Sequence, residues 1–320
     1  MKPVPSNRER QFKPSCIVLG GGGFIGTNLC RRLVSAGHRV RAFGRRCQFP
    51  DALRGAEWYQ GDFTDATALA AALETFDVVF HLVHSTTPQS ANLDMAGDVQ
   101  GNVVSSLALF DLCRKLKVRR LVFVSSGGTV YGLPGAIPTP ETAPTDPIGS
   151  YGVSKLAIEK YLAVHERLHG LDYRILRVTN PYGPFQVPIK NQGLVAAIIS
   201  KALRGESNEI WGDGSVIRDY IFIDDVVDAL VAASGDQSAG RIFNIGSGVG
   251  RSVREIIAAI ELALGNKLDI TWKPGRAADV PASVVAIARA EELMGWVPKT
   301  PLDAGLAQTI QWWRSRESER

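Results

Sequence analysis

Tyr151 and Lys155 are the pair of side chains in this sequence best suited to acid–base chemistry. They stand four residues apart in SYGVSKLAIEKYL, a spacing that places both on one face of a helix. An ammonium group beside a phenol favours the phenolate. Because the ordinary pKa of a phenol is about 10, a base that works near pH 7 needs that pKa lowered by about 3, or roughly 4 kcal/mol. The pair therefore predicts a base that takes the proton of a hydroxyl group.

A glycine-rich segment near the start of the chain predicts a dinucleotide site. Residues 20–26 read GGGGFIG and fit both G-x-x-G-x-x-G and G-x-G-x-x-G. The segment follows an apolar strand (16–20) and opens a helical pattern (24–37), the context that gives this motif its meaning. Glycines let the backbone approach a pyrophosphate, and the helix N-terminus offers free N–H groups and a partial positive charge. The residues expected to hold NAD or NADP here are Gly20, Gly23, Phe24, Ile25 and Gly26.

The end of the second strand leaves the choice between NAD and NADP open. An Asp or Glu usually stands there to bind the ribose 2′-hydroxyl of NAD. After the strand at 39–43 this chain has Gly44, Arg45 and Arg46 instead. A guanidinium suits the 2′-phosphate of NADP, and Arg45 is the candidate cofactor ligand. In the alternative interpretation both arginines are solvated loop residues.

The order of elements that must position these residues predicts an α/β fold. Further apolar strands at 77–83 and 120–126 alternate with helical patterns at 66–74 and about 98–117. Connections of this length favour a doubly wound parallel sheet, a Rossmann fold, with helices on both faces.

The sequence also predicts how the chain divides into domains. We expect a dinucleotide-binding domain over 15–178. Beyond it prolines and glycines become dense, which predicts a smaller mixed α/β substrate domain over 179–215 and 248–320. A strand–helix–strand pattern within 216–247 is expected to rejoin the large sheet.

Composition and charge exclude several classes of protein. Hydrophobic residues make up 45% and charged residues 21% of the 320 residues, as in soluble globular proteins. No apolar run reaches the ~18 residues that span a bilayer. Residues 1–14 lack a signal-peptide core and predict a disordered tail on a cytoplasmic protein. The net charge of +4 comes from scattered clusters, so neither a membrane nor nucleic acid is an expected partner.

The four cysteines do not predict a metal site. They form no CxxC pair and have no histidine at ligand spacing. Cys16, Cys30 and Cys113 fall in apolar patterns, where buried free thiols are expected. We therefore expect neither a metal nor a disulfide framework.

Several ordered motifs resemble those of the extended short-chain dehydrogenases/reductases, close to the UDP-glucose 4-epimerase group. The resemblance runs from residue 16 to about 315. It rests on GGGGFIG, GDFTD, FDVVFHL, FVSSGGTVYG, YGVSK, RVTNPYGP, WGDGSVIRDY and PGRAADVP. It implies an NAD-dependent nucleotide-sugar 4-epimerase of UDP-hexoses or UDP-N-acetylhexosamines. The alternatives are an NAD(P)H-dependent 4-keto-sugar reductase, a 4-epimerase of dTDP-sugars, and a non-catalytic NAD(P)-sensing protein on the same fold.

The resemblance also implies roles for individual residues. Tyr151 and Lys155 match the catalytic pair of the family, and Asn102 matches an asparagine that braces the active site. Trp211 matches an aromatic residue near the uracil, although packing within the small domain is the alternative. The other implied contacts are Asp62 and Phe63 beside the adenine, and Asn180, Arg218, Arg276 and Asp279 toward the sugar nucleotide.

Two departures from the family pattern bear on the reaction. The usual Ser or Thr four residues before Tyr131 is Gly127, so Ser126 is the candidate hydroxyl between Tyr151 and the substrate. Dehydratases of the family carry Asp and Glu just after this point, where the chain has Gly128 and Thr129. The resemblance therefore favours epimerisation over loss of water.

Three further expectations concern the substrate pocket and assembly. In the resembling epimerases, the residue four places after the Asp of an R-x-x-D pair lines the sugar pocket, and a small side chain there admits an N-acetyl group; the resemblance implies that Ser283 is this residue here. His84 follows the fourth strand and is expected to lie beside the nicotinamide without transferring a proton. By analogy with the family, a homodimer forms through helices at about 98–117 and 150–168.

Overall fold

The computed structural model describes residues 13–188, 193–235, 237–275 and 280–318, and it has the predicted α/β architecture. The strands of the main sheet are short, and most of their residues are buried, as expected for strands covered on both faces. They are β1 (Cys16–Leu19), β2 (Val40–Gly44), β3 (Glu57–Gln60), β4 (Val78–His81), β5 (Arg120–Ser126), β6 (Tyr173–Val178) and β10 (Ile242–Ile245).

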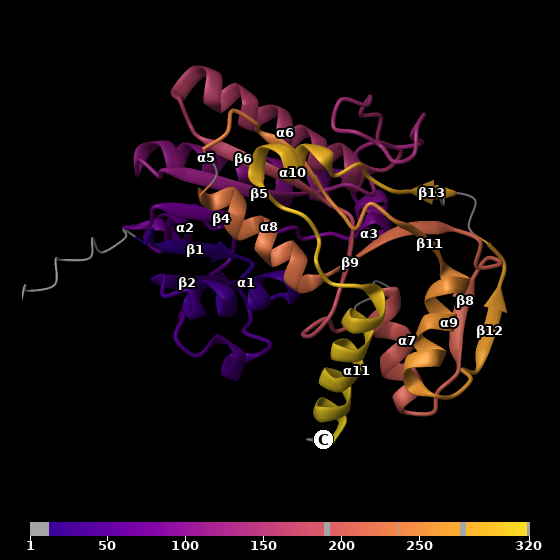
Figure 1. The fold of residues 1–320 in the computed structure, drawn as a ribbon. Helices are drawn as coiled ribbons and strands as arrows, with labels where there is room; N and C mark the ends of the chain where they lie inside the picture. Colours follow the sequence, from indigo (N-terminus) through magenta and orange to yellow (C-terminus); the bar gives the residue numbers. More distant parts are fainter. Residues whose placement is uncertain (1–12, 189–192, 236, 276–279, 319–320) are drawn as a thin grey trace, which may run out of the picture.

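All neighbouring strands of this sheet run parallel, in the order β10-β6-β5-β4-β1-β2-β3 (Figure 1). The chain moves outward from β1 to β3, then crosses back and continues from β4 on the other side of β1. The strand order therefore reverses between β1 and β4, and a ligand crevice is expected at the carboxyl ends of these two strands.

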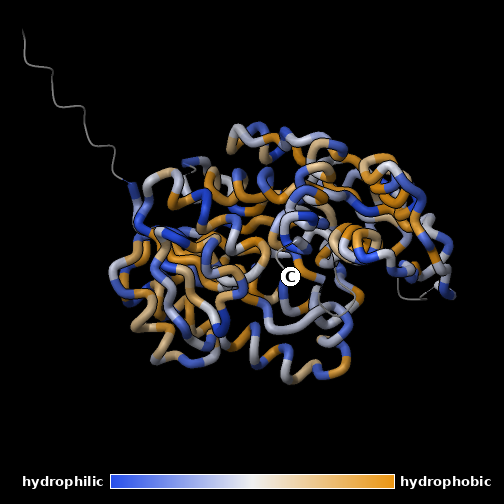
Figure 2. The backbone as a smooth tube through the Cα atoms, turned by 90° about the horizontal axis from the view of Figure 1, so that it is seen from below, coloured by the Kyte–Doolittle hydropathy of each residue, from blue (hydrophilic) through white to orange (hydrophobic). Residues whose placement is uncertain are grey.

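Helices cover both faces of the sheet. One face carries α2 (Ala66–Leu73), α5 (Ser105–Lys115) and α6 (Ser150–His169), whose apolar residues pack on Phe123 and Ile175. The other face carries α1 (Phe24–Ser35) and α8 (Ile223–Gly235). Polar segments lie mostly on the outside and hydrophobic ones run through the interior (Figure 2). The predicted buried thiols, Cys16, Cys30 and Cys113, are confirmed.

Between β4 and α5 the chain forms short helices rather than one long one. These are α3 (Pro88–Leu93), α4 (Met95–Asp98) and a π-helical turn over Val99–Val104. Thr87 and Ser90 form a capping box at the start of α3. The predicted helix over about 98–117 therefore begins as a π-helical turn and continues as α5. A π-helical turn often marks a functional site.

The second, smaller part of the chain has two sheets and three helices among the described residues. β11 pairs antiparallel with β9, and β13 and β7 run parallel to β9. The strands are β7 (Asn180–Tyr182), β8 (Asn208–Trp211), β9 (Ile217–Phe222), β11 (Gly250–Ser252), β12 (Ile270–Lys273) and β13 (Ala282–Ser283). The helices are α7 (Leu194–Leu203), α9 (Val253–Leu264) and α11 (Leu302–Ser318), whereas α10 (Ala288–Met294) packs against β10 of the large sheet.

One part of the predicted unit at 216–247 lies elsewhere. α8 and β10 join the large sheet as expected, but β9 lies at the centre of the four-stranded sheet. Its backbone pairs with β7, β11 and β13, and the buried Asp219 carboxylate accepts hydrogen bonds from the backbone N–H groups of Ser247 and Gly248, which follow β10. β9 therefore joins the smaller sheet to the end of the large one.

Candidate active site

The glycine loop has the geometry that a pyrophosphate site needs. A Cβ added at Gly26 would stand 2.2 Å from the carbonyl oxygen of Gly20, and one at Gly21 would stand 2.7 Å from the Cβ of Ala42. Gly23 begins α1 without any side chain capping the helix. The free N–H groups of the first turn of α1 therefore face a cradle that only glycine can form, and this cradle fits a dinucleotide.

Trp58 accounts for the missing acidic residue at position 44. A Cβ on Gly44 would lie 3.3 Å from Cη2 of Trp58, and a Cβ on Gly22 would lie 3.1 Å from the same atom. The indole thus covers the glycine loop and the end of β2 together. A side chain at position 44 would press against this indole. The chain therefore has no carboxylate here to bind the ribose 2′-hydroxyl of NAD.

Arg45, Asp62 and Phe63 flank this end of the sheet. The Asp62 carboxylate accepts hydrogen bonds from the backbone and hydroxyl of Thr64 at 2.9 and 2.8 Å. These bonds, with a smaller effect of Arg45, lower the pKa of Asp62. The Phe63 ring is buried and stacks on His81 at 4.8 Å between ring centroids. Arg45 itself is exposed and available to a cofactor.

Tyr151 and Lys155 lie together on the first turns of α6. The Lys155 ammonium is buried, lies 5.8 Å from the centroid of the Tyr151 ring and donates to the carbonyl of Val124 at 2.8 Å. Burial lowers the pKa of Lys155 to about 7, and the negative charges of Glu159 and Asp98 offset only part of this effect.

In the protein without a bound cofactor, the pKa of Tyr151 is raised, whereas the sequence predicted that it would be lowered. Burial raises it to about 12, and the charge of Asp98 adds to the increase. A partly neutral Lys155 cannot offset the loss of hydration around the phenol. Tyr151 is therefore a protonated phenol that needs a further positive charge nearby before it can act as a base, and an oxidised nicotinamide carries such a charge.

Asp98 organises the residues around Tyr151 and was missed by sequence reasoning. Its carboxylate is fully buried and accepts hydrogen bonds from Ser154 at 2.5 Å, Asn102 at 2.9 Å and Ser150 at 3.2 Å, and also from Thr86. Ser150 and Ser154 flank Tyr151 on α6. The only signal in the sequence was an Asp four residues before Asn102, at helical spacing.

Asn102 lies in the π-helical turn and braces the loop after β4. Its side-chain oxygen accepts from the backbone N–H of Ser85 at 2.8 Å, and its amide donates to the Asp98 side chain at 2.9 Å. These contacts lock the β4 loop to α4. They are consistent with the bracing role that the family resemblance implies.

The structure does not join Ser126 to Tyr151. No hydrogen bond of the Ser126 hydroxyl is found in the described residues, and along β5 it is the neighbouring Ser125 that reaches α6, donating to Glu159 at 2.5 Å. Gly127 has no room for a side chain, because a Cβ there would stand 2.9 Å from the carbonyl of Arg177. The role of Ser126 stays a prediction.

The predicted substrate residues lie on the smaller part of the chain. Asn180 donates to the carbonyl of Asp219 at 3.0 Å, and Arg218 donates to the carbonyl of Val280 at 2.7 Å. The Oγ of Ser283 lies 4.0 Å from where a Cβ on Gly128 would stand, next to the loop after β5. Arg276 and Asp279 lie outside the described residues.

Trp211 borders a pocket of about 870 Å³ rather than a packed core. Its side chain is 45% exposed, and Trp272, on the neighbouring strand β12, lines the same pocket. The Arg254 guanidinium stacks on the Trp272 ring at 4.8 Å. Two indoles and a cation offer stacking surfaces to a planar base. Trp272 was not identified from the sequence, because nothing in the local pattern links it to Trp211.

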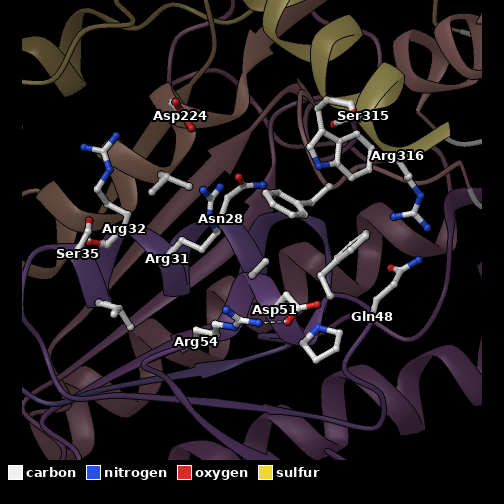
Figure 3. A pocket seen from close by; sticks show the side chains of 17 residues that line it. Asn28, Arg31, Arg32, Ser35, Gln48, Asp51, Arg54, Asp224, Ser315 and Arg316 are labelled. Atoms are coloured by element: carbon white, nitrogen blue, oxygen red, sulfur yellow. Dashed lines mark hydrogen bonds and ion pairs between the residues drawn. The ribbon is translucent and has the colours of Figure 1, made fainter. Parts of the chain in front are cut away.

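A second hollow of about 870 Å³ lies between α1, η1 (Pro50–Leu53), the start of α8 and α11 (Figure 3). The rings of Phe49, Phe185 and Trp312 pack there at centroid distances of 5.1 to 6.0 Å. Arg32 is paired with Asp228 at 2.8 Å. These contacts join segments that are far apart in the chain. The residues around this hollow therefore help to hold the two parts of the molecule together.

The described residues contain no cluster of three His, Cys, Asp or Glu side chains that could hold a metal ion. None of the helices in the same ranges combines the length and the apolar character that a bilayer crossing needs.

The buried histidines predict a pH-dependent stability. Burial lowers the pKa of His81 to about 3 and that of His84 to about 2, from an ordinary 6.5. Below pH 6.5 the unfolded chain binds two protons that the folded protein does not, so the free energy of unfolding falls as the pH falls. Because each of these imidazoles is only half protonated in the unfolded chain at pH 6.5, the loss steepens as the pH falls and approaches about 1.4 kcal/mol per pH unit for each histidine by pH 5, measured by urea unfolding. His84→Phe should halve that slope, and an unchanged slope would contradict the assignment.

Comparison with known proteins agrees with this geometry. A UDP-glucose 4-epimerase of Mycolicibacterium smegmatis is 38% identical over 309 residues, covering 94% of this chain and 98% of the relative. A UDP-glucose 4-epimerase of Thermotoga maritima, solved with UDP-glucose, superposes with a TM-score of 0.90 at 33% identity and covers 95% of this chain and 99% of that one. A UDP-N-acetylglucosamine 4-epimerase of Methanobrevibacter ruminantium superposes with a TM-score of 0.89 at 26% identity, covering 95% and 99%.

The predicted resemblance to the extended short-chain dehydrogenases/reductases of the UDP-glucose 4-epimerase group is confirmed by these relatives. The model of the NAD dependent epimerase/dehydratase family matches residues 16–246, which include the glycine loop, the Tyr151–Lys155 pair and the whole large sheet. The chain therefore belongs to the NAD dependent epimerase/dehydratase family.

Proposed function

We propose that the protein is an NAD-dependent nucleotide-sugar 4-epimerase that interconverts UDP-hexoses, UDP-N-acetylhexosamines or both by transient oxidation at C4. The observation that carries this proposal is the placement of Tyr151 and Lys155 on α6, beside the carboxyl end of β5 and across the sheet from the glycine loop. The absence of acidic side chains at Gly128 and Thr129 favours epimerisation over dehydration.

The proposed mechanism assigns a task to each part of the site. Tyr151 takes the proton of the sugar 4-hydroxyl and returns it to the C4 oxygen after the ring has turned over. Lys155 lies below the phenol and supplies positive charge to the phenolate. Bound NAD supplies the hydride acceptor and donor for C4. Arg218 anchors the diphosphate while the 4-keto sugar turns over, so that its other face meets the same base.

Trp211 and Trp272 are the proposed partners of the nucleotide base. Their pocket is bordered by β8 and β12, on the same part of the chain as Arg218. A base stacked there would leave the diphosphate near β9 and the sugar near Ser283 and Gly128. Both uracil and thymine can stack on indole, so a dTDP-sugar is the alternative substrate class.

NAD is the proposed cofactor and NADP the alternative. The description of the family names NAD, whereas the exposed Arg45 and the absence of an acid at Gly44 suit a 2′-phosphate. An epimerase ends each cycle with its cofactor oxidised, so the cofactor has no need to leave. We therefore expect NAD to copurify with the protein and to be identified after release by denaturation.

The decisive assay incubates purified protein with UDP- and dTDP-hexoses, without added cofactor, and separates the 4-epimers. Interconversion under these conditions supports the epimerase. The alternative, a 4-keto-sugar reductase, uses one equivalent of NADPH for each product, and strict NADPH consumption would establish it instead.

Ser283 is proposed to decide whether N-acetylated sugars are accepted. Its side chain is 8% exposed and faces the loop after β5, where the sugar is expected. Serine leaves room for an acetamido group, so the wild type should accept UDP-N-acetylglucosamine as well as UDP-glucose. Ser283→Tyr overfills the pocket at a cost of about 1–3 kcal/mol, and turnover of the N-acetylated sugar should fall about 5- to 100-fold.

Turnover of UDP-glucose by the Ser283→Tyr variant is the internal control and should survive. If both substrates decline in parallel, or if the wild type refuses N-acetylated sugars, Ser283 does not gate the pocket. Ser283→Ala, which keeps the space and removes the hydroxyl, separates the effect of volume from that of hydrogen bonding.

We also propose a homodimer through α5 and α6. Four apolar side chains of α6 are exposed, namely Val153 at 51%, Tyr161 at 43%, Val164 at 45% and Leu168 at 67%. An exposed apolar stripe of this kind is typical of an interface. Light scattering should give twice the chain mass of 34.6 kDa, and Val164→Asp should shift the protein toward the monomer.

A further inference from the structure

His84 is a buried imidazole beside the catalytic pair whose hydrogen-bonding capacity is unused. Its side chain is 7% exposed, and neither ring nitrogen has a hydrogen-bond partner in the described residues. It lies three residues after the end of β4, where the strand order of the sheet reverses. Since a buried polar atom without a partner is destabilising, such an atom in a ligand crevice indicates that a bound group supplies the partner.

The neighbours of His84 hold its ring in one orientation. The ring centroid lies 4.4 Å from that of Tyr151, with an angle of 70° between the planes. On its other side, Nε2 lies 3.6 Å from Oδ1 of Asp98. The imidazole is therefore wedged between the catalytic phenol and a buried carboxylate.

His84 stays neutral through the working range of the enzyme. Burial, with smaller effects of Lys155 and His81, lowers the pKa of His84 to about 2. A neutral imidazole has one N–H donor and one lone-pair acceptor and does not exchange protons near pH 7. This agrees with the prediction that His84 transfers no proton, and it leaves hydrogen bonding as its available role.

Asp98 decides which nitrogen carries the hydrogen. Its carboxylate acts as an acceptor in every hydrogen bond that it makes in the described residues, and the donors are Thr86, Asn102, Ser150 and Ser154. An Nε2–H facing Oδ1 suits this carboxylate, whereas an Nε2 lone pair would be repelled by it. Nδ1 is then left with the lone pair.

We propose that His84 is a further ligand-binding residue of this active site, in which Nδ1 accepts a hydrogen bond from an N–H or O–H group of the bound cofactor or sugar and Asp98 fixes the tautomer. Two ligands carry the required donors: NAD, through the carboxamide N–H of the nicotinamide or a ribose hydroxyl, and the sugar, through a hydroxyl. The proposal rests on the NAD-dependent nucleotide-sugar activity proposed above, and wild-type activity and cofactor content test that activity separately.

The test compares His84→Phe with His84→Asn. Phenylalanine keeps the ring and its contact with Tyr151 but has no nitrogen, so the unliganded variant should melt at the wild-type temperature or above it. Asparagine is smaller but keeps an acceptor, and it should restore part of the binding. Two ligand measurements are made on each protein: the NAD retained through purification and dialysis, and the affinities for UDP-glucose and for UDP by tryptophan fluorescence, with the dTDP compounds substituted if the wild type prefers them.

The two arms identify the donor. If NAD is the partner, His84→Phe loses NAD about 3- to 10-fold more readily and binds the sugar nucleotide normally. If a sugar hydroxyl is the partner, affinity for UDP-glucose falls by the same factor while that for UDP and the retention of NAD are unchanged. Unchanged binding of both ligands, within twofold, overturns the proposal. So does a weakening matched by a lower melting temperature, because that would indicate a structural role.

His165→Phe is the matched control. His165 lies on the same helix as Tyr151 and also has a buried Nδ1 without a partner in the described residues, but its ring packs on Phe110 and His169, away from the site. This variant should change the melting temperature in the same direction and leave both ligand measurements at the wild-type level. Equal weakening in His165→Phe would also overturn the proposal.

Discussion

Tyr151→Phe should reduce the turnover number at least about 100-fold while leaving the affinity for the sugar nucleotide nearly unchanged. The substitution removes one hydroxyl from a ring whose surroundings, including His84 at 4.4 Å between centroids, stay in place. Since only the proton-transferring group is lost, kcat should carry the effect. The measurement is the rate of epimer interconversion without added cofactor, together with substrate binding by tryptophan fluorescence.

Tyr161→Phe is the matched control for this variant. Tyr161 lies on the same helix, ten residues after Tyr151, and its side chain is 43% exposed. It should turn over at the wild-type rate. If Tyr151→Phe also stays within a few-fold of wild type, Tyr151 is not the base.

Arg177→Met should lower the free energy of unfolding by about 3–5 kcal/mol, the usual cost of leaving one member of a buried ion pair alone. Arg177 and Glu159 are each 2% exposed in their side chains and meet at 2.6 Å. Arg177 also donates to the hydroxyl of Tyr131 at 2.9 Å, and Glu159 accepts from Ser125 at 2.5 Å. The variant leaves the buried Glu159 carboxylate without its counter-charge, whereas the Tyr131 hydroxyl keeps its hydrogen bond to Asn244 at 2.7 Å.

The double variant Arg177→Met/Glu159→Gln distinguishes a stranded charge from lost packing. Removing both charges should recover much of the stability lost in Arg177→Met, as measured by urea unfolding. Arg54→Met is the surface control, because the Arg54–Asp51 pair is 83% and 86% exposed, and it should change stability by no more than about 0.5 kcal/mol. If the double variant is as unstable as Arg177→Met, packing rather than charge accounts for the loss.

Residues that act through local geometry were found by the sequence alone. The glycines of the loop must stand next to one another, because the turn, the helix N-terminus and the close approach of Gly26 to Gly20 are all formed within seven residues. Tyr151 and Lys155 are brought together by one turn of helix. The strands β1, β2, β4 and β5 were predicted for the same reason, since apolar runs bounded by turn residues are local signals.

Contacts between distant segments were decided by the tertiary structure. Trp58 covers Gly44 from the neighbouring strand, Trp272 joins Trp211 from more than 60 residues away, and Asp98 reaches across to Ser154. β9 was expected in the large sheet because its apolar run looks like that of any buried strand. Its backbone pairs with β7, β11 and β13 instead, and Asp219 ties this smaller sheet to the segment after β10.

The ionisation of the catalytic pair shows the same division. The spacing of Tyr151 and Lys155 predicted that the lysine charge lowers the pKa of the phenol. That prediction considered charge and left out burial. Burial acts on both groups at once: it raises the pKa of Tyr151 to about 12 and lowers that of Lys155 to about 7. The sequence by itself thus determined which residues form the proposed catalytic pair, while the depth at which the fold buries them decided their pKa values, because desolvation depends on every segment packed around them.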